Sequence, residues 1–274
     1  MKHNSEIAAA LGKPLWRTDS FVPRYRCGEN GSWKLNPGGQ LVHDWGYFTG
    51  PCLVEMLPSL SRKAKSRNGG DGDTWETWMS LTPHEIESQE LGYRCAFGEM
   101  VIMGLGMGWI AANAALNHQV SKVTVVERDS DVIRLFSESG ALDSLDASAQ
   151  EKIDIVNADA LTWCPAPDQS VDFLYADIWL HLAEPEAIGQ VRRMQNNVEA
   201  RTIYFWGQEI AIYSASSCVS NNEGEISPEV IRLAVSEVIN LPLLIPTDRN
   251  YAKMIQDVIK NRTERHLPIE IELG

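Results

Sequence analysis

The feature that most constrains the fold is the segment 100–108, an apolar run that ends in three alternating glycines. The apolar run is typical of a buried parallel strand. Gly104, Gly106 and Gly108 permit positive φ angles and let a ligand approach the backbone closely. The Ala-rich segment 109–116 contains no helix breaker and predicts a helix, whose N-terminus offers free N–H groups and a positive dipole end. Strand, glycine turn and helix in this order predict a loop that cradles a nucleotide.

A second β-rich run supports this interpretation. It covers 123–126 and ends at Glu127, which lies 21 positions after Gly106. An acidic residue at about this distance accepts the ribose hydroxyls of a nucleotide in such strand–helix–strand units. The alternative is an ordinary turn followed by a surface glutamate.

The following chain alternates between strand and helix patterns. Strands are predicted at 153–156, 171–176 and 202–206, and helices at 130–139 and 185–196. This alternation predicts a parallel sheet with helices on both faces. The expected fold class is therefore α/β, a doubly wound, mostly parallel Rossmann-like sheet.

The N-terminal region has a different pattern. Aromatic residues and turn signals between 15 and 57 predict hairpins in a small β-rich cap. The basic and then glycine-rich segment 61–73 predicts a flexible surface linker. We therefore expect two parts, a cap at 1–78 that includes this linker and a cofactor-binding domain at 79–274.

Helices flank the predicted sheet on the N-terminal and C-terminal sides. Thr82 as cap, with Glu85 completing a capping box, predicts a helix that runs to about residue 95. Two more helices are predicted at 227–240 and 251–262, and a short one at 5–12.

Composition limits the classes of partner. The net charge of −13 and the pI near 4.9 argue against a nucleic-acid partner, because phosphate binding needs a basic surface. No apolar run approaches membrane-spanning length and no signal sequence is recognisable, so we expect a cytoplasmic protein without a membrane partner. The five cysteines lack CxxC spacing, which indicates reduced thiols and no metal site. The sequence leaves open whether the chain is a monomer or a homodimer.

Candidate ligand groups fall at the predicted carboxyl ends of four strands. They are the glycine turn, Glu127, Asp159 and Asp177. Ligands of open parallel sheets bind at this edge, so we expect the four groups to share one site. Each acidic residue also has a simpler interpretation: Asp159 as an N-cap for 161–163, and Asp177 as a cap of the next turn.

These residues resemble those of the class I S-adenosylmethionine-dependent methyltransferases, over about residues 80–206. The glycine turn resembles their first motif, and Glu127 matches the residue that holds the ribose hydroxyls. Asp159 and Ala160 match the segment that takes the adenine. Asp177 matches the acidic residue close to the methionine part or the substrate.

The resemblance implies S-adenosyl-L-methionine as cofactor and methyl transfer to a small-molecule acceptor. A sulfonium methyl group is already activated, so the enzyme mainly aligns the reactants, and a base helps where the acceptor loses a proton. Beside Asp177, the candidate base is His181, the nearest histidine to this edge, with a surface histidine as the alternative. Trp179 is a candidate wall of the acceptor pocket, with core packing as the alternative.

Within this superfamily the chain is most similar to the spermidine-synthase-like branch. The β-rich cap and the non-acidic Ile102 two places before the first glycine are typical of that branch. However, Met107 stands where aminopropyltransferases carry an aspartate, and Ile178 and Trp179 replace the Asp-Ser-Ser/Thr-Asp pattern. A polyamine-forming aminopropyltransferase is therefore an alternative, although this chain lacks the signature residues of that class.

Two further alternatives remain. An NAD-dependent oxidoreductase is compatible with Glu127 and with the G-x-G-x-x-A pattern of 106–111. That class leaves Asp159 without a role, and no clear catalytic His, Lys or Tyr set follows. The last alternative is a non-catalytic protein that binds a nucleoside and has lost its acceptor site.

Overall fold

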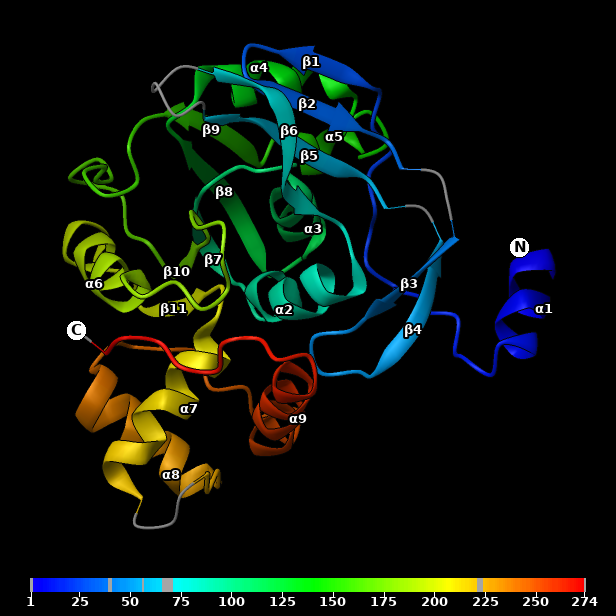
Figure 1. Ribbon diagram of the computed structural model, residues 1–274. Helices are drawn as coiled ribbons and strands as arrows, with labels where there is room; N and C mark the ends of the chain where they lie inside the picture. The colour runs from blue at the N-terminus through cyan, green and yellow to red at the C-terminus, as the bar shows by residue number, and fades with distance from the viewer. Residues whose placement is uncertain (1, 39–40, 56, 66–70, 221–223, 274) are drawn as a thin grey trace.

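The centre of the molecule is a five-stranded parallel sheet in the order β11-β10-β7-β8-β9 (Figure 1). The computed structural model describes residues 2–38, 41–55, 57–65, 71–220 and 224–273. The strands are β7 (Gly98–Met103), β8 (Val120–Glu127), β9 (Ile153–Asn157), β10 (Phe173–Ala176) and β11 (Thr202–Phe205). All four strand pairs are parallel, which confirms the predicted α/β fold class.

Helices connect the strands in both directions from β7. The connecting helices are α3 (Trp109–Leu116), α4 (Ser130–Ser139), the short α5 (Ala147–Gln150) and α6 (Ala187–Val198). The chain moves outward through β8 to β9 on one side of β7, and from β10 to β11 on the other. Because such crossovers are right-handed, α3 and α4 cover one face of the sheet and α6 covers the other. The fold is therefore doubly wound, as predicted.

Local signals fix the ends of α4 as the sequence predicts. The Asp129 carboxylate caps the first turn by accepting the N–H of Asp131 at 3.0 Å. Gly140 ends the helix with φ of 75°, a left-handed conformation that favours glycine.

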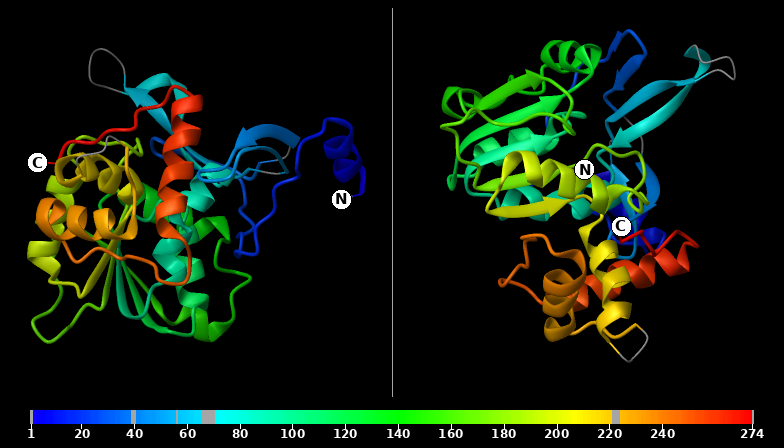
Figure 2. Two further views of the ribbon diagram at one scale, coloured as in Figure 1. Left: turned by 90° about the horizontal axis from the view of Figure 1, so that it is seen from below. Right: turned by 90° about the vertical axis from the view of Figure 1, so that its left-hand side faces the viewer.

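A four-stranded antiparallel sheet, here called the N-terminal sheet, lies above the carboxyl edge of the parallel sheet (Figures 1 and 2). Its order is β1-β2-β5-β6, with β1 (Gly28–Asn30), β2 (Trp33–Asn36), β5 (Ser59–Lys65) and β6 (Asp71–Ser80). A separate hairpin pairs β3 (Leu41–Trp45) with β4 (Pro51–Glu55). The predicted β-rich cap is therefore present, and its division from the rest at residue 78 stays a prediction.

The flexible linker predicted at 61–73 is wrong for the described residues. Positions 61–65 belong to β5 and positions 71–73 to β6, and these strands pair with each other in an antiparallel hairpin. Residues 66–70 lie outside the described part of the chain. The composition misled because basic side chains and glycines are equally compatible with a strand–turn–strand unit whose pairing is set by cross-strand contacts.

Helix α2 (Pro83–Arg94) leads into β7 and lies beside α3. Thr82 caps it by accepting the N–H of Glu85 at 3.2 Å, as predicted. The return half of the capping box is wrong, because the Glu85 carboxylate instead accepts a hydrogen bond from Gln89 Nε2 at 2.7 Å. Glu85 is thus held along the helix, where it lines a cavity.

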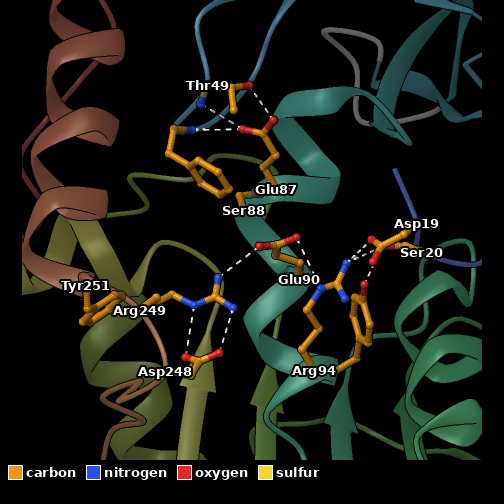
Figure 3. A network of polar contacts seen from close by, with 12 residues as sticks. Asp19, Ser20, Thr49, Glu87, Ser88, Glu90, Arg94, Asp248, Arg249 and Tyr251 are labelled. Atoms are coloured by element: carbon orange, nitrogen blue, oxygen red, sulfur yellow. Dashed lines mark hydrogen bonds and ion pairs between the residues drawn. The ribbon is translucent and has the colours of Figure 1, made fainter. Parts of the chain in front are cut away.

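Polar contacts along α2 fasten segments from both ends of the chain to this helix (Figure 3). The Glu87 carboxylate accepts the N–H groups of Phe48 and Thr49, both at 3.1 Å. One helical turn later, Glu90 pairs with Arg249 at 3.2 Å. Arg94 pairs with Asp19 at the end of the helix. These contacts fix α2, and with it Glu85 and Gln89, relative to the sheet.

The C-terminal part packs below β11 in Figure 1. It contains α7 (Gln208–Val219), α8 (Pro228–Leu233), the π-helical turn η1 (Ala234–Ile239) and α9 (Tyr251–Glu264). The fully buried Glu209 on α7 accepts hydrogen bonds from the hydroxyls of Tyr47 at 3.0 Å and Tyr251 at 2.9 Å. This network ties the N-terminal hairpin region to α9.

The predicted helices at 227–240 and 251–262 are present, and the one predicted at 5–12 is α1 (Lys2–Ala10), set apart from the sheet. Among the described residues, no helix is long and apolar enough to cross a membrane.

Candidate functional site

A cavity of about 430 Å³ lies at the carboxyl edge of the parallel sheet, beneath the N-terminal sheet. Six of the residues predicted from strand ends line it: Gly104, Gly106, Glu127, Asp159, Ala160 and Asp177. Trp179 lines it as well. Parallel strands deliver their ends to one edge, so residues 73 positions apart in the chain share this cavity.

Two of the predicted site residues do not line the cavity. Gly108 caps α3 with φ of 70°, and a Cβ at this position would collide with the ring of Phe136 on α4. Its role is therefore close helix packing. His181 is exposed, because the chain leaves the sheet edge after Trp179 and carries the imidazole away from the cavity.

The glycine turn makes two close approaches that a side chain would prevent. Gly104 has φ of 102°, and a Cβ there would collide with the backbone carbonyl of Asp177 at the end of the neighbouring strand. Gly106 has φ of 51°, and a Cβ there would collide with the sulfur of Met79 from β6. The turn is thus pressed between the parallel sheet and the N-terminal sheet.

Glu127 holds this turn in place. Its Oε2 accepts the N–H of Leu105 at 3.0 Å, and its Oε1 accepts the N–H of Asp129 at 2.8 Å. Each carboxylate oxygen has a second lone pair, so the same side chain is able to accept the two hydroxyls of a ribose.

Asp159 combines both of the roles considered from the sequence. Its Oδ1 caps the following turn by accepting the N–H of Leu161 at 2.8 Å. The side chain is exposed and borders the cavity, and within the described residues Oδ2 makes no hydrogen bond. That oxygen is available to a ligand that also reaches the backbone of Ala160.

Two neighbouring carboxyl groups, those of Asp177 and Glu85, line the part of the cavity that is here called its inner end. Burial raises the pKa of Asp177 from its ordinary value to about 7, and the Tyr175 hydroxyl, which donates to Oδ2 at 3.4 Å, opposes the shift. Burial, and next the negative charge of Asp177, raise the pKa of Glu85 well above its ordinary value. Burial therefore favours the protonated, uncharged form of both carboxyl groups.

Sequence reasoning did not identify Glu85 and Gln89 as cavity residues. The available signal was their spacing of four residues, which places both on one face of α2. The capping pattern at Thr82 already explained a glutamate at position 85, so nothing in the sequence indicated that Glu85 also lines a cavity.

Aromatic side chains form a part of the remaining walls. Trp179 is buried, and its indole N–H donates to Gln190 Oε1 at 2.7 Å. The indole N–H of Trp206 donates to Ser88 Oγ at 2.8 Å. Trp33 and Trp78 enter from the N-terminal sheet with their rings edge-to-face at 5.4 Å. The walls of the cavity thus combine aromatic rings with charged and polar groups.

The titration of Asp177 has a consequence for stability. The pKa of this group is 3.8 in a model peptide and about 7 in the folded protein, so the native state binds more protons across that window. The protonated Asp177 contributes to the free energy of unfolding. This contribution is fully present below about pH 4 and is lost as the pH rises through 7. We expect Asp177→Asn, which cannot ionise, to melt about 2 °C or more above wild type at pH 8.

Thermal unfolding between pH 4 and pH 8 measures this effect. The difference between Asp177→Asn and wild type should shrink as the pH falls toward 4. Asp154→Asn, which changes an exposed carboxylate on β9, is the matched control and should show no such trend. A constant difference at every pH would contradict the raised pKa.

Comparisons with known proteins give limited matches. No protein-family model matches the chain. A polyamine aminopropyltransferase from Leptospira interrogans is 34% identical over 82 residues, which are 29% of this chain and 16% of that protein. The match therefore spans less than a fifth of the length of that relative.

Solved structures with similar folds include the 23S rRNA methyltransferase ErmE, with 20% identity over 43% of both chains and a TM-score of 0.32. Another is the glycopeptide N-methyltransferase MtfA complexed with S-adenosyl-L-methionine, with 18% identity over 41% of this chain and 47% of that chain, and a TM-score of 0.30. At such low TM-scores the fold assignment depends on the strand order of this chain itself.

Proposed function

We propose that the protein is an S-adenosylmethionine-dependent methyltransferase that acts on a small-molecule acceptor. The observation that carries this proposal is the convergence of the glycine turn, Glu127, Asp159 and Asp177 on one cavity. In this arrangement the ribose lies at Glu127 and the adenine lies beside Asp159 and Ala160. The sulfonium then lies near Gly104 and faces the inner end of the cavity.

The inner end supplies the chemistry that the acceptor needs. The sulfonium methyl group requires alignment with the acceptor more than activation. The Asp177 and Glu85 pair accepts the proton that an amine or hydroxyl acceptor loses, and a pKa of about 7 suits a base at neutral pH. Trp179 and Trp206 exclude water from this end. The cavity volume of about 430 Å³ and the net charge of −13 support a small acceptor over a nucleic acid.

Aminopropyl transfer is the second candidate, favoured by the 34% identity to a polyamine aminopropyltransferase over 82 residues. The same cavity would hold that donor. The released nucleoside separates the two reactions: methyl transfer releases S-adenosylhomocysteine, whereas aminopropyl transfer releases 5′-methylthioadenosine.

Intrinsic fluorescence tests the cofactor assignment directly, because five tryptophans line the cavity: Trp33, Trp78, Trp109, Trp179 and Trp206. We expect S-adenosylhomocysteine to change the emission in a saturable way and NADH to leave it unchanged at equal concentration. Tight binding of NADH without binding of S-adenosylhomocysteine would instead establish the oxidoreductase alternative.

A further inference from the structure

Two arginines, Arg62 and the exposed Arg128, line the cavity, and Arg62 lies among aromatic rings. Arg62 on β5 is half-buried and lines the cavity, and its guanidinium lies beside two indole rings that meet edge-to-face. The guanidinium carbon is 5.2 Å from the centroid of the Trp33 ring and 5.6 Å from that of Trp78. Contact with aromatic rings stabilises the charge of the guanidinium without using its N–H donors, which stay available for hydrogen bonds.

The carboxylates of the cavity do not satisfy these donors. Among the residues that the structure describes, no carboxylate lies within ion-pair distance of Arg62. The nearby Asp129 accepts the indole N–H of Trp33 with its Oδ2 at 2.8 Å and makes no ion pair with Arg62. Glu76, which lies opposite Arg62 on β6, is exposed and makes no ion pair with it. A half-buried guanidinium that makes no ion pair within the described residues is able to bind a ligand carboxylate, often through two parallel hydrogen bonds.

The neighbours of Arg62 locate it along the cavity. Met79, next to Trp78 on β6, rests on Gly106 of the glycine turn. The indole N–H of Trp33 donates a hydrogen bond to Asp129, and the backbone N–H of Asp129 donates one to Glu127. Arg62, Trp33 and Trp78 therefore lie against the glycine turn and the loop that follows Glu127. In the proposed arrangement this is the side of the cavity that holds the cofactor.

We propose that Arg62 receives the carboxylate of the amino-acid chain of the cofactor, an assignment that rests on the proposed function. The guanidinium then pairs with both carboxylate oxygens while Trp33 and Trp78 pack beside it. A donor of an aminopropyl group ends in an amine and has no carboxylate at this place. Arg62 thus selects S-adenosylmethionine over such a donor, and with it methyl transfer over aminopropyl transfer.

Two nucleosides that differ only in the carboxylate provide the test. They are S-adenosylhomocysteine and 5′-(3-aminopropylthio)-5′-deoxyadenosine, and isothermal titration calorimetry measures the affinity of each. We expect the wild type to bind S-adenosylhomocysteine about tenfold more tightly, as one charge-assisted hydrogen-bonded pair provides. Arg62→Gln should remove this preference by weakening only the carboxylate-bearing ligand, and Arg62→Lys should keep part of it.

Lys63→Gln is the matched control, because Lys63 lies next in β5 but stacks on Trp75 and does not line the cavity. It should retain the preference of the wild type. Unchanged affinity of Arg62→Gln for the aminopropyl compound establishes that the cavity is intact. Equal binding of both compounds by the wild type, or an undiminished preference in Arg62→Gln, overturns the role of Arg62 alone. Failure of the wild type to bind either compound overturns the cofactor assignment and this inference together.

Discussion

Glu127→Ala is expected to weaken the binding of S-adenosylhomocysteine by about tenfold or more, because two effects add. The substitution removes the acceptor of the ribose hydroxyls. It also frees the N–H groups of Leu105 and Asp129, which the carboxylate holds at 3.0 Å and 2.8 Å, so the glycine turn loses its fixed shape. Calorimetric titration of the purified variant measures the loss.

Glu138→Ala is the control for this prediction. Glu138 is an exposed glutamate near the end of α4 and does not line the cavity, so its removal changes the net charge by the same amount. Its affinity for the nucleoside should equal that of the wild type. If Glu127→Ala also bound like the wild type, the ribose assignment would be refuted.

Asp177→Asn is expected to reduce the transfer rate by about 10² to 10⁴ while the affinity for S-adenosylhomocysteine stays within a few-fold of wild type. Asparagine preserves the shape of the side chain but cannot accept a proton. The wild-type rate should rise as the pH passes through about 7, where Asp177 becomes ionised, and the variant should lack this rise. The assay is the formation of S-adenosylhomocysteine at several pH values with an acceptor that the wild type methylates.

Asp168→Asn, an exposed loop aspartate, controls for the loss of one charge and should keep the wild-type rate and pH profile. A normal rate in Asp177→Asn would assign proton transfer to another group, with Glu85 as the first candidate. A large loss of nucleoside affinity in the same variant would instead show that Asp177 holds the cofactor.

The parts of the site that follow from local patterns were predictable. One helix and one strand separate Gly104 and Gly106 from Glu127, and the topology of a parallel sheet requires that they meet. Asp159 was predicted both as a cap and as a ligand group, because a residue just after a strand end serves either purpose. The structure places its two carboxylate oxygens in different environments, which the sequence does not reveal.

The parts that depend on packing between distant segments were not predictable. Arg62 reaches the cavity because the N-terminal sheet docks over it, and Glu85 reaches it because α2 packs beside α3. The segment 61–73 was misread as a linker because its composition does not reveal strand pairing. The pairing of β5 with β2 and β6 depends on contacts across the sheet. Helix α7 was missed because its buried face includes Gln208 and Glu209, so the apolar period that marks a surface helix is absent.

The central claim is that a sulfonium nucleoside lies along the carboxyl edge of the parallel sheet. A crystal structure of the complex with S-adenosylhomocysteine tests it most directly. We predict density in the cavity with both ribose hydroxyls within hydrogen-bond distance of Glu127 and the adenine beside Asp159 and Ala160. A nucleoside bound away from Glu127, or a cavity that stays empty at saturating S-adenosylhomocysteine, would contradict the claim.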